Sequence, residues 1–264
     1  MPEKPEVITV TKKLEKRLLG RKITDCKVYY EPIIDYPSSK EFIKKIKNQT
    51  INSFSTRGKW IVIELDTDYL LVHLRMEGKF FYREINSPLE KHHHVVFTID
   101  NSEELHFQDV RKFGRMKLIP KEKINDMPPF TELGLEPWDK NLTVDYLKEH
   151  LKNKKIPIKT ALLDQSIITG IGNIYDDEIL FLSHINPLTP ANQVSSNKLK
   201  EHITELLDEK SKPNKVFLVR NGISNPKCYG VEKAKIRQKN KLCYVGTIEK
   251  WLDFRILEKS VSIW

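Results

Sequence analysis

The spacing of apolar residues near the N-terminus predicts a helix. Between Glu6 and Leu19, apolar side chains recur at three- and four-residue intervals with lysines between them, and Gly20 follows as a helix-ending residue. Pro5 suits a first helical turn. In such a helix Glu3 and Glu6 lie near one another at the positive end of the helix dipole.

The period of the pattern changes over residues 24–119, where apolar and polar positions alternate. Residues 59–76 (KWIVIEL, DTD, YLLVHLRM) predict one hairpin, and residues 93–110 (HHVVFTI, DNSE, ELHFQDV) predict another. Strands joined by short turns, with few helical patterns among them, indicate a β-sandwich or a barrel.

Helical spacing returns in the second half of the chain. Residues 121–140 contain no sustained period, and the stretch 120–140 holds four of the fourteen prolines, so we interpret it as a linker. Helices or helix edges are expected at 142–153, 158–173, 174–185 and 195–210. The fold class is therefore α+β: an N-terminal helix with a β-sandwich, and then a helical domain.

The positive charge of the chain is concentrated at its C-terminal end. The formal net charge is +9, and residues 212–264 hold 12 Lys or Arg against 4 Asp or Glu, whereas the remainder holds 33 against 32. This distribution indicates a local surface for a polyanion, with a solvated basic tail as the alternative. Few aromatic residues accompany the charge, which favours phosphate as the contact.

Composition narrows the class of protein further. No apolar run approaches the roughly 20 residues that span a bilayer, and no secretory signal pattern precedes the first helix. Three cysteines without a Cys-x-x-Cys pair fit a reducing compartment, so we expect a cytoplasmic protein without membrane partners.

The N-terminus carries candidate chemistry. Removal of Met1 exposes the secondary amine of Pro2, and α-amino groups have a pKa near 8, well below that of lysine. Such an amine attacks an aldehydic carbon to give an iminium cation, and Glu3 beside it is suited to protonate a departing oxygen. The alternative is an ordinary disordered leader.

Two further stretches carry candidate contacts to nucleic acid. In HFQDVRKFG (106–114), Arg111 is suited to donate a bidentate fork to a base edge and Phe113 to wedge between base steps; a plain hairpin tip is the alternative. In residues 162–180, Gly170 and Gly172 predict a tight turn and Asn173 a helix cap. The free backbone N–H groups at the start of this helix would bind phosphate. The alternative is an ordinary capped helix after a glycine turn.

Seven motifs occur in one order over 178 residues: MPEKPEV, TRGKW, HLRMEGKF, KHHHV, DVRKFG, LGLEP and LLDQSIITGIGNIYDDE. Together with INPLTPANQ (185–193), they make residues 2–192 resemble the formamidopyrimidine-DNA glycosylase (Fpg/Nei) family. The resemblance implies a bifunctional DNA glycosylase/AP lyase that removes 8-oxoguanine and formamidopyrimidines and nicks the strand by β,δ-elimination. Met76, Arg111 and the PEKPEV start favour the Fpg branch over the pyrimidine-preferring Nei branch.

The resemblance also implies roles for individual residues. Pro2 would be the nucleophile on C1′ and form the Schiff base, Glu3 the acid that opens the sugar ring, Glu6 a supporting carboxylate, and Lys59 a catalytic-site lysine on the phosphate near the lesion. Met76 would fill the space left by the flipped base. The remaining DNA contacts would be Arg111 on the orphaned cytosine, Phe113 as the wedge, and His92, Lys159 and Asn173 on backbone phosphates.

With these roles, the expected organisation is a catalytic β-sandwich domain (1–120), a linker (121–140), a DNA-binding domain with a helix–two-turn–helix (141–211) and a basic tail (212–264). The consecutive histidines of KHHHV are not interpreted as a metal site, because alternate strand residues point to opposite faces. We expect a monomer acting on double-stranded DNA with oxidised bases or abasic sites.

The tail departs from the family. Relatives end in a zinc finger with two Cys-x-x-Cys pairs, whereas only Cys228 and Cys243 occur here and no histidine follows His202, so no zinc or other cofactor is expected. Residues 241–250 look like a remnant of the finger hairpin. A zincless finger, a diverged tail and a shifted reading frame remain alternatives. Competing hypotheses for function are a damaged-DNA or abasic-site binding protein and a lyase without base selection.

Overall fold

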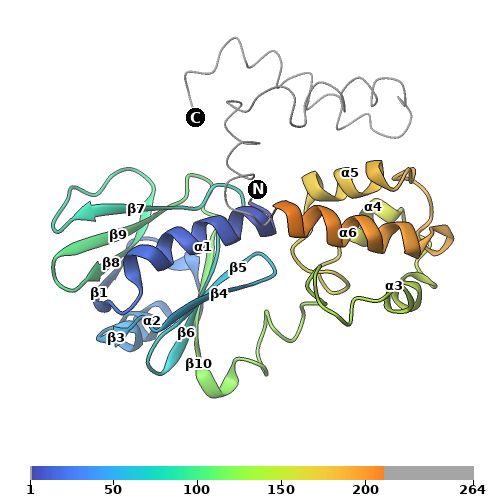
Figure 1. Ribbon diagram of the computed structural model, residues 1–264. Coiled ribbons are helices and arrows are strands. Elements are labelled where there is room, and N and C mark those ends of the chain that lie inside the picture. The colour runs from blue at the N-terminus through green and yellow to red at the C-terminus, as the bar shows by residue number, and fades with distance from the viewer. Residues whose placement is uncertain (1, 211–264) are drawn as a thin grey trace, which may run out of the picture. The chain divides into compact units, whose positions relative to one another are not determined.

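The computed structural model describes residues 2–210 of the protein, with side chains through Leu207. The chain divides into two compact units, one ending at Leu133 and the other beginning at Gly134 (Figure 1). The expected tail and finger remnant, residues 212–264, lie outside the described residues, as does Met1. Within the described part, no helix is long and apolar enough to cross a membrane.

The first unit combines two α-helices and ten strands. The helices are α1 (Lys4–Leu18) and α2 (Ser39–Ile46), with 3-10 turns η1 (Glu31–Ile33) and η2 (Lys121–Lys123). The strands are β1 (Lys22–Val28), β2 (Ile34–Tyr36), β3 (Gln49–Thr50), β4 (Ser53–Arg57), β5 (Trp60–Glu64), β6 (Asp68–His73), β7 (Lys79–Glu84), β8 (His93–Ile99), β9 (Glu103–Gln108) and β10 (Arg115–Pro120).

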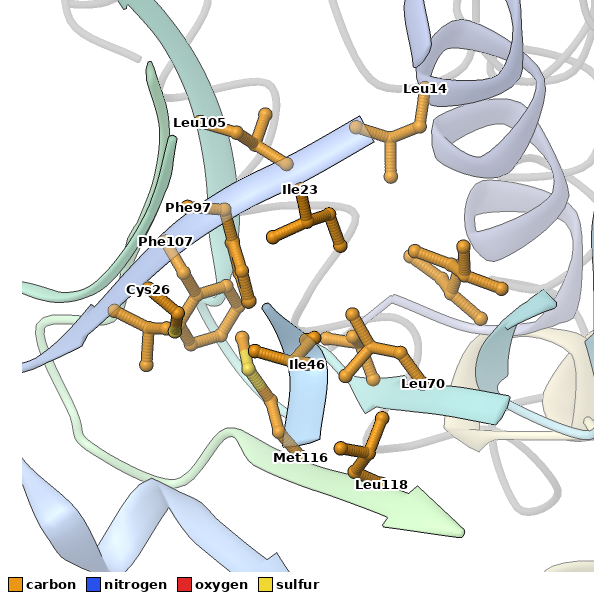
Figure 2. Packing of buried hydrophobic residues seen from close by; sticks show 14 of the residues in the cluster. Leu14, Ile23, Cys26, Ile46, Leu70, Phe97, Leu105, Phe107, Met116 and Leu118 are labelled. Carbon is orange, nitrogen blue, oxygen red and sulfur yellow. The ribbon is translucent and has the colours of Figure 1, made fainter. Parts of the chain in front are cut away.

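These strands form two five-stranded sheets, in the orders β3-β1-β8-β9-β7 and β2-β10-β6-β5-β4. Neighbouring strands are antiparallel except β2 and β10, which pair in parallel. The predicted hairpins are confirmed as β5–β6 and β8–β9. Figure 2 shows side chains from both sheets in one core, including Ile23 and Phe97 of one sheet and Leu70 and Met116 of the other. The predicted β-sandwich is therefore confirmed.

The first helix begins earlier than the apolar spacing predicts. Helix α1 starts at Lys4, because Glu3 is its N-cap and Pro5 lies in its first turn. It ends before Gly20, which has φ +77°, as the sequence predicts. Leu14 and Leu18 are buried in the sandwich core. The helix thus fixes the N-terminal residues against the sandwich.

The second unit is helical. Its helices are α3 (Val144–Leu151), α4 (Ile158–Leu162), α5 (Asn173–Leu182) and α6 (Ser196–Lys210), with the 3-10 turn η3 (Ala191–Gln193). Leu147, Leu162, Ile179 and Ile203 contribute to its separate core. The α+β class with a helical second part is confirmed.

The segment 158–173, expected as a helix or a helix edge, is helical from Ile158 to Leu162 and again only at Asn173, where α5 begins. The Asp164 carboxylate accepts hydrogen bonds from the Ser166 N–H (3.0 Å) and hydroxyl (2.6 Å). The Gln165 amide donates to the carbonyl of Ile171 and accepts from the N–H of Gly170. These local side-chain bonds replace the helical ladder, so the chain turns instead.

Candidate active site

The N-terminal turn of α1 brings Pro2, Glu3 and Glu6 together. The Glu3 N–H donates to Glu6 Oε2 at 2.8 Å, and the Glu6 N–H donates back to the Glu3 carboxylate. Each glutamate therefore satisfies a backbone donor at the helix start that has no partner within the helix. Pro2 is buried, and Glu3 is only 2% exposed. The two glutamates therefore lie close together, as predicted, and form a reciprocal capping box directly after Pro2.

Lys59 belongs to the same group of charges. It follows Gly58, which has φ +53°, in the two-residue turn between β4 and β5, and its side chain is buried. Burial lowers the pKa of the Lys59 ammonium, the charge of Arg75 lowers it further, and the charges of Glu3 and Glu6 oppose the shift. Lys59 therefore lies within electrostatic reach of both carboxylates, on a two-residue hairpin turn.

His73 and Arg75 extend this group, although the sequence analysis assigned them no role. His73 lies opposite Trp60 in the β5–β6 register, with ring centroids 4.9 Å apart. Its Nδ1 accepts a hydrogen bond from the Arg75 N–H at 3.0 Å, so a neutral ring carries its proton on Nε2. Burial, together with the charges of Arg75 and Lys59, lowers the pKa of His73 to about 3. The imidazole is neutral at physiological pH.

The three residues predicted to occupy the space of a flipped base lie on two turns. Met76 is exposed in a turn closed by the Gly78 N–H, which donates to the Leu74 carbonyl at 2.9 Å. Arg111 and Phe113 are exposed in the loop after β9, with the guanidinium carbon 4.8 Å from the Phe113 ring centroid. Exposed apolar and cationic side chains on tight turns are suited to insertion into a duplex.

One buried ring touches both turns. A Cβ added to Gly78 would lie 2.9 Å from Phe107 Cζ, and one added to Gly114 would lie 2.7 Å from the same atom. Phe107 is fully buried in the sandwich core, where Figure 2 shows it next to Phe97. The structure therefore brings the Met76 turn and the Arg111–Phe113 loop against a common support.

The consecutive histidines have different partners. His92 has φ +68° and is half-buried. His93 is hydrogen-bonded through Nδ1 to Nδ1 of His106 at 2.9 Å, whereas His94 Nε2 lies 2.9 Å from the carbonyl oxygen of Asp109. Among residues 2–210, no group of three or more His, Cys, Asp or Glu side chains is arranged to hold a metal ion.

The last two predicted residues lie on two contacting helices of the second unit. Lys159 of α4 forms an ion pair with Asp177 of α5 (Nζ to Oδ1, 2.5 Å), one turn beyond Asn173. The expectation that Asn173 caps α5 is wrong: Gly172 is the N-cap, and Asn173 is the first helical residue, with an exposed side chain. Gly170, at φ +94°, forms the predicted turn before it.

Both units match family models. Residues 1–116 match the formamidopyrimidine-DNA glycosylase N-terminal domain, and residues 133–212 match the formamidopyrimidine-DNA glycosylase H2TH domain. A formamidopyrimidine-DNA glycosylase of Ligilactobacillus salivarius is 44% identical over 201 residues, covering 76% of this chain and 72% of the relative. One from Bacillus anthracis is 43% identical over 203 residues, covering 76% and 73%.

Solved structures agree with these matches. Lactococcus lactis Fpg in complex with DNA containing N7-benzyl-Fapy-dG aligns with a TM-score of 0.75 and 35% identity, covering 80% of this chain and 79% of that one. A complex of the same enzyme with DNA containing an abasic site aligns with a TM-score of 0.75 and 34% identity, over 80% and 79% of the two chains. The sandwich and the helical unit therefore follow a known architecture.

Proposed function

Because this chain belongs to the formamidopyrimidine-DNA glycosylase family, we propose that it is a bifunctional DNA glycosylase/AP lyase of base-excision repair acting on oxidised purines. The observation that carries the proposal is the N-terminal group of residues: buried Pro2, the capping box of Glu3 and Glu6, and Lys59 within reach of both carboxylates. 8-Oxoguanine and ring-opened formamidopyrimidines are the proposed substrates.

In the proposed reaction, the Pro2 nitrogen attacks C1′ of the damaged nucleotide after Met1 has been removed. The bond between C1′ and the base breaks, and the base leaves with the proton that the Pro2 nitrogen loses on bonding to C1′. Glu3 protonates the ring oxygen as the sugar opens, which leaves an iminium between C1′ and Pro2. The iminium cation acidifies the C2′–H bond. Loss of that proton expels the 3′ phosphate, and a second elimination expels the 5′ phosphate.

Lys59 and His73 are suited to hold the phosphate beside the lesion. Lys59 supplies a positive charge, and neutral His73 supplies an Nε2–H donor. The desolvation that lowers the pKa of Lys59 is offset when a phosphate approaches, because the anion favours the charged lysine. We propose that the two side chains align the sugar with Pro2, while Glu6 holds Glu3 in place.

The exposed residues on the two turns would maintain the duplex once the damaged base is flipped. Met76 would fill the vacated space, Arg111 would hydrogen-bond the orphaned cytosine, and Phe113 would wedge the opposite strand. Unstacking a base costs a few kcal/mol, and these insertions offset part of that cost. His92, Lys159 and Asn173 would bind backbone phosphates, and Lys159 would then share its charge between Asp177 and the DNA.

The proposed partner is double-stranded DNA containing an oxidised base or an abasic site, bound by a monomer in the cytoplasm. The four-ligand zinc site of the family does not fit this sequence, which has Cys228 and Cys243 as its only tail cysteines and no histidine after His202. No step of the proposed reaction involves a metal ion.

The activity is tested on three labelled duplexes: one with 8-oxoguanine opposite cytosine, one with an abasic site, and one undamaged. We expect release of the base and a one-nucleotide gap with phosphate at both ends from the first, and the same gap from the second. Cleavage of the abasic duplex alone would support a lyase without base selection. Binding of damaged duplexes without cleavage would leave a damage-binding protein and overturn the enzymatic proposal.

A further inference from the structure

The loop that carries Arg111 and Phe113 is built around one buried carboxylate. Asp109, at the start of the loop, is fully buried. Its Oδ1 accepts a hydrogen bond from the Arg111 N–H at 3.1 Å, and its Oδ2 accepts one from the Gly114 N–H at 2.6 Å. The two oxygens therefore hold both ends of the segment that contains Arg111 and Phe113.

The backbone of Asp109 attaches the same loop to the segment at the start of β8. The Asp109 N–H donates to the His92 carbonyl at 3.1 Å, and the Asp109 carbonyl accepts from His94 Nε2–H at 2.9 Å. The Lys112 N–H donates to that carbonyl as well, at 3.2 Å. Every polar group of Asp109 is thus engaged in fixing the loop.

The conformation held in this way is one that a free loop would rarely adopt. Lys112, between the two functional residues, has φ +59°, which is unfavourable for a residue with a side chain. Gly114 has no room for a Cβ, which would lie 2.7 Å from Phe107 Cζ and 3.1 Å from Asp109 Oδ2. Strained backbone persists only where the surroundings over-determine it, and here the Asp109 carboxylate supplies much of that constraint.

Within residues 2–210, Asp109 forms no ion pair with a lysine or arginine. A buried carboxylate is costly unless its oxygens accept hydrogen bonds, and the donors that satisfy this one include the N–H groups of Arg111 and Gly114. The Asp109 carboxylate therefore contacts the backbone of the loop and fixes its conformation.

We propose that Asp109 is the positioning residue that presents Arg111 and Phe113 to the base opposite the lesion, and that it thereby determines how strictly that base is read. This inference rests on the proposed function of Arg111 and Phe113. Hydrogen bonds to a base edge depend on the orientation of the side chain that donates them. A loosened loop should therefore reduce discrimination among the bases opposite the lesion even where the protein stays folded.

The test compares Asp109→Asn and Asp109→Ala with the full-length protein. Asparagine retains one acceptor oxygen for the Arg111 N–H, whereas alanine retains none. The measurement is the ratio of single-turnover excision rates for 8-oxoguanine opposite cytosine and opposite adenine. We expect this ratio to fall at least about tenfold in Asp109→Ala, with Asp109→Asn between it and the wild type.

Asp66→Asn is the matched control, because Asp66 also accepts a backbone N–H, that of Thr50 at 2.7 Å, in a turn of the same unit. It should leave the ratio unchanged. Unchanged ratios in folded Asp109 variants would overturn the inference, and so would an equal drop for cytosine and adenine, since that is the result of a merely structural role.

Amide hydrogen exchange of the wild-type protein without DNA gives a second readout that requires neither activity nor a variant. We expect the Arg111 and Gly114 amides to be protected and the Val110 amide, for which no acceptor is seen among residues 2–210, to exchange faster. Fast exchange at Arg111 and Gly114 would overturn the inference. Protected amides in a protein that excises nothing would instead count against the proposed function alone.

Discussion

The Glu3 amide donates a 2.8 Å hydrogen bond to the Glu6 carboxylate, and the Glu6 amide donates one in return to the Glu3 carboxylate. The two residues thereby fix the backbone that follows Pro2. A helix cap is ordinarily a matter of stability, but here it also fixes the direction in which the N-terminal amine leaves α1. In the proposed reaction, catalysis and local folding would therefore depend on the same four-residue segment.

Replacement of Glu6 tests this coupling. Glu6→Ala removes the acceptor for the Glu3 N–H, so we expect it to destabilise the protein by about 1 kcal/mol and to slow base excision. Glu6→Gln retains a side-chain acceptor and should keep most of the stability and most of the rate. Thermal unfolding and single-turnover excision measure the two effects. Equal rates for Glu6→Ala and the wild type would show that the cap does not orient the nucleophile.

Lys59 should affect activity and stability in opposite directions. Its buried ammonium is desolvated in the free protein, which is why its pKa is lowered. Lys59→Met keeps the volume without the charge, so we expect unfolding temperatures at or above that of wild type and excision slowed by at least about tenfold. A variant that is destabilised but fully active would contradict this.

The lowered pKa of Lys59 also predicts a pH effect on excision. A lysine with a pKa below 10.5 loses its proton at a lower pH than an exposed lysine, so the alkaline decline in kcat/KM, which reports the protein before DNA binds, should begin correspondingly early. Lys59→Arg keeps its charge throughout this range and should move the decline to higher pH. The same alkaline profile in both proteins would exclude Lys59 as its origin.

His73 predicts a dependence of stability on pH. Its pKa is lowered from 6.5 in the unfolded chain to about 3 in the folded protein. Between these values the unfolded chain binds more protons, so stability is complete above pH 6.5 and falls as the pH drops toward 3, by a maximum on the order of 5 kcal/mol. His73→Asn keeps an acceptor for the Arg75 N–H and should flatten this part of the profile. Denaturant unfolding at several pH values measures it, with His150→Asn on the exposed face of α3 as control.

Alanine substitutions at Gly78 and Gly20 should distinguish the effect of a steric clash from that of backbone strain. In Gly78→Ala the new Cβ would lie 2.6 Å from the Leu74 carbonyl oxygen and 2.9 Å from Phe107 Cζ, so the turn that carries Met76 must move. We expect both stability and excision to fall. Gly20→Ala places a Cβ in open space at φ +77° and should cost about 1 kcal/mol with excision unchanged. If both variants excise at the wild-type rate, the position of the Met76 turn is not critical.

Lys159 predicts a change in the salt dependence of DNA binding. If it contacts one phosphate, Lys159→Ala should reduce the slope of log affinity against log salt by about 0.9. Lys148→Ala removes an exposed lysine of α3 that pairs with Asp145 and should leave the slope unchanged. Titration of a labelled abasic-analogue duplex at several salt concentrations distinguishes the two.

Short-range patterns predicted most of what the structure contains. The alternation in 59–76 and 93–110 indicated both hairpins, and the spacing of Glu3 and Glu6 at a helix start predicted that they lie together. Helix α2 was not predicted, although Ser38 followed by Glu41 is the signature of its N-terminus, and the Ser38 hydroxyl indeed accepts from the Glu41 N–H. The apolar residues of 39–46 were too few to reveal a helix by period alone.

What sequence reasoning missed depends on contacts between distant segments. His73 is the first residue of the motif HLRMEGKF. Its environment nevertheless follows from the pairing of β6 with β5, which places it opposite Trp60 and near Lys59. Phe107 was predictable as an inward-facing strand residue. Its contact with both Gly78 and Gly114 requires the three-dimensional arrangement of the turns.

The central claim, that the amine of Pro2 is the nucleophile, is tested most directly by borohydride trapping on a duplex with 8-oxoguanine opposite cytosine. We expect a covalent protein–DNA adduct whose DNA-bearing peptide, identified by mass spectrometry, begins at Pro2. A protein with one alanine added before Pro2 retains every side chain but turns the nitrogen into an amide, and it should give no adduct at Pro2. An adduct on an internal lysine, or an undiminished adduct in the extended protein, would contradict the account.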